Sequence, residues 1–285
     1  MNVDRKRASL LSVVACFILI GTIITAIKLH RINFPLEAAA AANSGEAIHI
    51  AKFHHINPSP EEPFALLSRA IAKGDQATVK RMLDSGHSPD LSDEDGKTLL
   101  YVAVFRKQTD IIKLLLDKGA DINARPNTGV SPLILAASLC YIAPFYVLLE
   151  RDPDISVKDR LGETVLFKAA AYCEDDLVKA LISKGAKVNI RSNDGSTPLH
   201  RARTNGRTIE MLLEAGADIN AVDKYGDTPL MEAISYALLE KTKTLVDRGA
   251  DVNVRNKEGK TALRLAREKY RGSIIEILRR AGAIE

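Results

Sequence analysis

Histidines and cysteines are the first residues to weigh for metal binding, because they supply the common zinc ligands. His49, His54 and His55 lie close together, but no cysteine or carboxylate follows at ligand spacing, so a solvated loop is expected. Cys140 and Cys173 are 33 residues apart, which fits neither a zinc motif nor a disulfide framework. The sequence therefore predicts no metal site and no cofactor.

Catalytic motifs are missing from the chain. It has no GxxxxGK[ST], HExxH, GxSxG or GxGxxG pattern. His87 and His200 stand singly, and His200 is expected to hydrogen-bond a neighbouring turn. The many carboxylates are expected at turns and on helix surfaces, exposed to solvent. We therefore expect no enzymatic activity and no small-molecule substrate.

The composition limits the class of partner. The net charge is only +4 over 285 residues, which gives little attraction for phosphates, so a nucleic-acid partner is not expected. Aromatic residues make up 5% of the chain and tryptophan is absent. This composition fits layers of leucine, isoleucine, valine and alanine better than one large core.

A repeated pattern organises residues 96–285. Six glycines recur at spacings of 33, 33, 33, 31 and 33 residues: Gly96, Gly129, Gly162, Gly195, Gly226 and Gly259. Each opens a similar phrase, clearest in Thr197-Pro198-Leu199-His200-Arg201-Ala202. A second phrase closes most units, as in Gly216-Ala217-Asp218-Ile219-Asn220. Two motifs that recur in step indicate one structural unit copied along the chain.

These phrases resemble the ankyrin-repeat family, whose period is about 33 residues. The resemblance implies an all-α ankyrin-repeat solenoid of stacked helix–turn–helix units. We expect a degenerate N-terminal capping repeat at 63–95, ankyrin repeats at 96–128, 129–161, 162–194, 195–225 (shortened) and 226–258, and a C-terminal capping repeat at 259–285. No unit can bury its apolar side alone, so neighbouring units must stack.

Local chemistry agrees with this interpretation. Threonine or serine caps the first helix, proline suits its first turn, and glycine suits the left-handed position after the second helix. The fourth unit is two residues short between Gly206 and Leu212, so we expect a clipped second helix or a tightened turn. In the second unit, Pro144 should lie near the start of the second helix, and Asp152 replaces glycine, which predicts an irregular C-cap.

Residues 8–27 carry no charge and are mostly apolar, with Arg5, Lys6 and Arg7 before them and Lys28 after them. A helix of this length spans about 30 Å, the thickness of the bilayer core. We expect a basic tail at 1–7, one transmembrane anchor helix at 8–27 and a linker at 28–62. A cleaved signal peptide and a buried soluble helix remain alternatives.

The orientation follows from the basic residues that flank the anchor. They are slightly more numerous on its N-terminal side, which favours a cytoplasmic N-terminus and a translocated repeat domain. In a bacterium that domain would lie in the periplasm.

Cys140 and Cys173 hold the same position in adjacent units. Equivalent positions of stacked helices are about 8–10 Å apart, farther than the Cα separation of about 7 Å that a disulfide tolerates. We expect two separate thiols.

The family resemblance implies binding through the turn tips and the concave face of the first helices. Seven residues at these positions have the large apolar, aromatic or arginine side chains that anchor interfaces: Phe105, Arg106, Leu139, Leu161, Tyr172, Tyr225 and Tyr236. We expect a protein partner there, on a membrane-anchored scaffold. A structural or stress-protective scaffold without a dedicated partner, or an enzyme's regulatory subunit, remains the alternative.

Overall fold

The computed structural model describes residues 62–173, 175–203 and 206–284. The predicted anchor at 8–27 lies outside the described residues, as does the predicted linker up to residue 61. Within the described part of the chain, no helix is both long enough and apolar enough to cross a bilayer.

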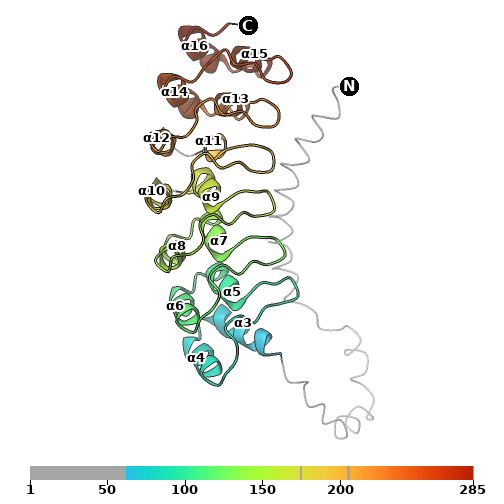
Figure 1. Ribbon diagram of the computed structural model, residues 1–285, viewed down its shortest axis with the longest axis vertical. Helices are drawn as coiled ribbons and strands as arrows, with labels where there is room; N and C mark the ends of the chain where they lie inside the picture. The colour runs from blue at the N-terminus through green and yellow to red at the C-terminus, as the bar shows by residue number, and fades with distance from the viewer. Residues whose placement is uncertain (1–61, 174, 204–205, 285) are drawn as a thin grey trace, which may run out of the picture. The chain divides into compact units, whose positions relative to one another are not determined.

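The described residues form an all-α solenoid, which confirms the predicted fold class. Two rows of helices run side by side, and long loops project from the first of them (Figure 1). This inner row contains α3 (Pro63–Lys73), α5 (Leu99–Phe105), α7 (Pro132–Ser138), α9 (Val165–Tyr172), α11 (Pro198–Arg201), α13 (Pro229–Ser235) and α15 (Ala262–Glu268). The outer row contains α4 (Gln76–Asp84), α6 (Thr109–Asp117), α8 (Ile142–Leu149), α10 (Asp175–Ser183), α12 (Gly206–Glu214), α14 (Leu239–Asp247) and α16 (Gly272–Arg280).

Hydroxyl caps start most inner helices, as the sequence predicts. The side chains of Thr98, Ser131, Thr228 and Thr261 each accept a hydrogen bond from a backbone N–H in the first turn. Such a cap satisfies one of the donors that a helix N-terminus leaves without an intrahelical partner. The outer helices α6, α10, α12 and α14 are each followed by a glycine in the left-handed region, with φ between 84° and 87°.

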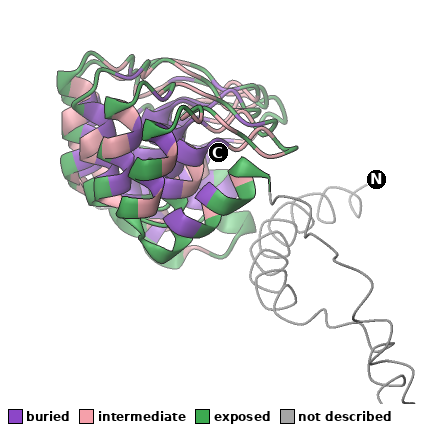
Figure 2. Ribbon diagram, turned by 90° about the horizontal axis from the view of Figure 1, so that it is seen from below, coloured by how far each residue is buried: buried purple, intermediate pink, exposed green. Residues whose placement is uncertain are grey.

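The core runs continuously between the two rows. Leu100, Ile112, Phe145, Leu199 and Leu230 are at most 1% exposed, although they come from four different repeats. Figure 2 shows buried residues on the facing sides of the helices, and many exposed residues on the outer helices and the loops. Each repeat therefore depends on its neighbours to cover its apolar side.

The loops form a second stack beside the inner row. In one loop the Asp223 N–H donates to the carbonyl of Asp227 at 3.0 Å, which closes a tight turn. Consecutive loops are joined in the same way, since the Lys257 N–H donates to the carbonyl of Tyr225 at 2.9 Å. Gly226 has φ of 80°, and a Cβ there would lie 2.9 Å from the Lys257 nitrogen, so the turn requires glycine.

The fourth repeat is shortened at its first helix, and of the two expected alternatives, a clipped second helix or a tightened turn, the clipped second helix is wrong. α11 has only four residues, whereas the inner helices α5, α7, α9, α13 and α15 have seven or eight. α12 keeps nine residues, like α6, α10, α14 and α16. The outer helix stays whole because its full apolar face, including Ile209 and Leu212, is needed to fill the core.

The C-cap of the second repeat is irregular, as expected, because α8 ends at Leu149 and Pro153 lacks the N–H that Ala120 and Ala186 donate to the last turn of α6 and α10. α8 begins at Ile142 and carries Pro144 in its first turn, where a missing N–H costs no hydrogen bond. Asp152 adopts φ of 50°, the left-handed conformation that glycine has in the other repeats. Aspartate tolerates this region better than most residues, and the Lys184 ammonium pairs with its carboxylate at 2.6 Å.

Candidate protein-binding surface

Five of the seven candidate residues lie at the C-terminal ends of inner helices. Phe105 and Tyr172 are the last residues of α5 and α9, and Arg106, Leu139 and Tyr236 directly follow α5, α7 and α13. All five are exposed, and Tyr172, at 59%, is more exposed than Phe105, Leu139 or Tyr236. The Arg106 guanidinium lies 5.7 Å from the centre of the Phe105 ring.

Leu161 and Tyr225 occupy loop tips and form a separate group. They are 60% and 53% exposed, and each carbonyl accepts a backbone hydrogen bond from the next loop. The Lys224 ammonium lies 5.0 Å from the centre of the Tyr225 ring. The loop stack holds these two backbones in place while their side chains face solvent.

Contacts between repeats link part of the helix-end group into one strip. The Cys140 thiol donates to the carbonyl of Tyr172 at 2.8 Å, which ties the end of α7 to the end of α9. The Arg203 N–H donates to the carbonyl of Ala170 at 3.3 Å, and its guanidinium stacks 4.3 Å from the centre of the Tyr236 ring. We call Leu139, Tyr172, Arg203 and Tyr236 the helix-end strip. Arg203 is not among the residues predicted from the sequence. Because α11 has only four residues, the end of this inner helix comes earlier in the repeat than in the other units.

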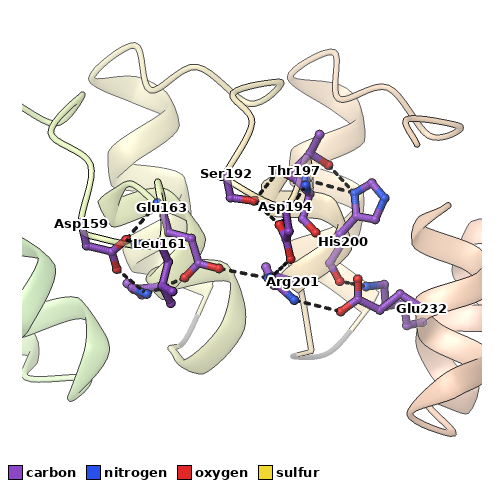
Figure 3. Close-up of polar contacts among 12 residues, drawn as sticks. Asp159, Leu161, Glu163, Ser192, Asp194, Thr197, His200, Arg201 and Glu232 are labelled. Atoms are coloured by element: carbon purple, nitrogen blue, oxygen red, sulfur yellow. Dashed lines mark hydrogen bonds and ion pairs between the residues drawn. The ribbon is translucent and has the colours of Figure 1, made fainter. Parts of the chain in front are cut away.

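Arg201 lies at the centre of an ion network that joins three repeats (Figure 3). Its Nε bonds Glu163 at 3.0 Å, one Nη bonds Asp194 at 2.7 Å, and the other bonds Glu232 at 3.4 Å. The Glu163 and Glu232 side chains are only 9% and 11% exposed. The expectation that the carboxylates are solvated is therefore wrong for these residues.

The network occupies one position of the repeat. From α5 to α15, the fourth residue of the inner helix is Val102, Leu135, Lys168, Arg201, Glu232 or Leu265 in order along the chain. Among these six helices, charged side chains replace apolar ones in α9, α11 and α13. Lys168 bonds Glu163 and pairs with Asp159 at 2.8 Å, so it extends the network toward the second repeat.

Lys241 is a buried cation beside this network. It is 2% exposed, and its Nζ donates a hydrogen bond to the carbonyl oxygen of His200 at 2.6 Å. Carbonyls in the last turn of a helix have no intrahelical donor, and His200 lies in the last turn of the four-residue α11. The Lys241 side chain therefore caps the helix that the fourth repeat has shortened.

Burial and neighbouring charges shift several pKa values. Burial lowers the pKa of Lys241 to about 7, partly offset by the carboxylate of Glu232. Burial raises the pKa of Glu232, against the pull of Lys241 and Arg201. Burial disfavours the charged form of Arg201, yet Glu232, Asp194 and Glu163 raise its pKa overall. Arg201 therefore remains the permanent cation of the network.

His200 bonds neighbouring turns, as the sequence predicts. Its Nδ1 accepts the Thr197 N–H at 3.1 Å, so its Nε2 carries the proton and donates to the carbonyl of Asp227 at 3.1 Å. The side chain is 1% exposed, and burial lowers its pKa to about 4. The ring is therefore neutral and joins the fourth repeat to the fifth. In the described residues, no group of three or more histidine, cysteine or acidic side chains could hold a metal ion.

Comparisons with known proteins agree with this architecture. Two models of ankyrin repeats match the chain, one at residues 67–159 and 145–223 and the other at 212–266. No curated protein sequence shows a significant match to the chain.

Two solved structures resemble the repeat domain. The ankyrin repeat domain of Bcl-3, described as a member of the IkappaB protein family, is 28% identical with a TM-score of 0.64, over 75% of this chain and 97% of that one. The human ASB11 ankyrin repeat domain is 26% identical with a TM-score of 0.67, over 77% of this chain and 98% of that one. Ankyrin repeats are protein-interaction scaffolds, and the family models cover well over half of the sequence. The chain therefore belongs to the ankyrin-repeat family.

Proposed function

We propose that this chain is a membrane-anchored scaffold that holds a protein partner on its inner helices and loop tips. Residues 8–27 would anchor it, with the N-terminus in the cytoplasm and the repeat domain translocated, in the periplasm of a bacterium. The observation that supports the binding surface most is the helix-end strip, where exposed apolar side chains from several repeats are linked by contacts.

The chemistry of the strip suits protein recognition. Tyrosine and arginine are enriched among residues that carry binding energy, since they combine a large contact area with hydrogen-bonding groups. Tyr172 and Tyr236 offer rings that are about half exposed, and Arg203 lies against one of them. A partner that covers the strip would bury these rings and keep their hydroxyl groups at the edge.

The ion network favours a preformed surface. Arg201 connects loops and helices of the third, fourth and fifth repeats, which are the repeats that carry Tyr172, Arg203 and Tyr236. A surface already held in its binding geometry loses less conformational entropy when a partner binds. The buried charges thus support recognition by fixing the spacing of the strip.

A co-purification experiment tests the surface. The full chain is isolated from native membranes beside a Tyr172→Ala/Tyr236→Ala variant, with circular dichroism to check that both fold alike. We expect one protein to co-purify with the parent chain and to be lost from the variant.

The matched control is Ile142→Ala/Leu239→Ala, which removes two exposed apolar side chains at the starts of the outer helices α8 and α14. This control variant should still co-purify with the partner protein. If the tyrosine variant retains the partner while the control loses it, the binding surface lies on the outer helices.

A reporter at the C-terminus tests the topology separately. A reporter enzyme that is active only after export should be active when it is fused to residue 285. A reporter that is active only in the cytoplasm should be inactive at the same position. The reverse pattern would place the repeat domain in the cytoplasm and overturn the proposed orientation.

A further inference from the structure

Cys140 and Cys173 meet at the junction of the second and third repeats. Cys140 follows the residue that caps α7, and Cys173 caps α9. The Cys173 thiol donates to the carbonyl oxygen of Ala137 at 2.7 Å, and the Cys140 sulfur lies 3.8 Å from the same oxygen. Because both sulfur atoms touch one atom, their separation cannot exceed the sum of these two distances.

The hydrogen bonds of the two thiols also cross the junction. Cys140 donates to the carbonyl of Tyr172, the residue before Cys173, at 2.8 Å. Cys173 donates to the carbonyl of Ala137, three residues before Cys140. Each thiol thus contacts the backbone that carries the other. Alanines at the ends of both helices, including Ala137 and Ala170 at 0% exposure, permit this approach.

From this geometry we propose that Cys140 and Cys173 form an intramolecular disulfide when a disulfide oxidant is present. In the structure both are thiols. A disulfide needs an S–S bond of about 2 Å and Cα atoms within about 7 Å, so each thiol must rotate out of its hydrogen bond. The carbonyl of Ala137 keeps the backbone N–H of Cys140 as a donor at 3.2 Å, and the carbonyl of Tyr172 lies where water can replace the thiol.

The unequal burial of the two thiols sets the order of the reaction. Cys140 is half-buried and Cys173 is 3% exposed. With oxidised glutathione, the Cys140 thiolate attacks one sulfur and forms a mixed disulfide, and one glutathione thiolate leaves. The Cys173 thiolate then attacks the Cys140 sulfur and expels the second glutathione. The two cysteines lose two electrons and two protons, and glutathione disulfide becomes two molecules of glutathione.

The bond would act on the proposed binding surface as well as on stability. It closes a loop of about one repeat, which restricts the unfolded chain. It also joins the residues next to Leu139 and Tyr172, so it fixes the spacing of two members of the helix-end strip. Bond formation itself depends only on the two thiols and does not require the proposed partner or membrane.

The test uses the full chain with Cys16→Ser, which leaves only the two cysteines of the repeat domain. The folded protein is incubated with oxidised glutathione, then denatured, alkylated without reductant and digested for mass spectrometry. We expect a linked peptide that contains Cys140 and Cys173, the loss of both reactive thiols, and a rise in melting temperature that dithiothreitol reverses.

Two serine variants make the test specific. Cys173→Ser should hold glutathione on Cys140 permanently, whereas Cys140→Ser should leave Cys173 unreacted until the protein unfolds. Circular dichroism checks that both variants fold. Stable glutathione on Cys140 of the parent protein without the linked peptide, or linkage only between two chains, would overturn the proposal.

Discussion

The Lys241 ammonium lies 2.6 Å from the carbonyl oxygen of His200, so a side chain of the fifth repeat caps the first helix of the fourth. In α6, α10 and α16 the third residue is the apolar Ile111, Leu177 or Ile274, and each of these is buried. Lys241 takes the same place in α14. A lysine therefore occupies a core position, beside the one inner helix of the described repeats that has only four residues.

We predict that the stability contributed by Lys241 rises with pH. Its pKa is lowered from 10.5 to about 7 by burial, so between these values the unfolded chain binds a proton that the folded chain lacks. Raising the pH through this window therefore favours the folded state. The melting temperature should rise more between about pH 7 and about pH 9 in the parent than in Lys241→Met. Lys243→Met, on the exposed side of the same helix, should behave like the parent.

We predict the same sign for His200 at lower pH. Burial lowers its pKa from 6.5 to about 4, so the unfolded chain binds more protons between these values, and stability falls as the pH drops through them. Between about pH 6.5 and about pH 4, the stability of His200→Gln should therefore fall less than that of the parent. Thermal unfolding at several pH values checks it, and identical acid profiles for the two proteins would show that His200 is not buried in its neutral form.

Removing Arg201 should destabilise the central repeats strongly. Arg201→Met leaves Glu163, Asp194 and Glu232 without their shared cation, and breaking such a buried pair costs about 3 kcal/mol. Arg248 provides the matched control, because it pairs with Glu210 and Glu214 on the exposed side of the outer helices. Arg248→Met should cost less than about 1 kcal/mol. Urea denaturation of both variants measures the difference, and equal costs would contradict a buried network.

Two glycines with similar φ should respond differently to alanine. At Gly119, with φ of 84° and open space around it, alanine should cost about 1 kcal/mol, because only the left-handed conformation is strained. At Gly226 the added Cβ would also lie 2.9 Å from the Lys257 nitrogen, so Gly226→Ala should cost about 2 kcal/mol or more. Urea denaturation compares the two, and a cost at Gly226 no greater than at Gly119 would show that the loops are not tightly stacked.

The sequence predicts the fold well because its signals repeat. Glycine at the left-handed turn and threonine at the helix start each satisfy a backbone requirement that recurs in every unit. The exposure of Tyr172 and Tyr236 could also be predicted, since the family pattern places them at helix ends.

The ion network could not be predicted in the same way. Glu163 is buried because Lys168 and Arg201 approach it from two different repeats, and no single unit of sequence contains that set. A signal was nevertheless present, because Lys241 stands where α6, α10 and α16 have isoleucine or leucine. The sequence does not predict the short α11, because the repeat spacing shows that two residues are missing but not which helix lacks them. The packing of the core decides that the first helix is shortened and the second is kept.

Photo-cross-linking in native membranes tests the central claim most directly. A photoreactive phenylalanine analogue replaces Tyr172 in the full chain, and in a control it replaces Ser183, which is exposed at the end of the outer helix α10. We predict one dominant adduct with another protein from position 172 and none of that mass from position 183. The same adduct from position 183 alone, or no adduct from position 172, would contradict a protein-binding surface at the ends of the inner helices.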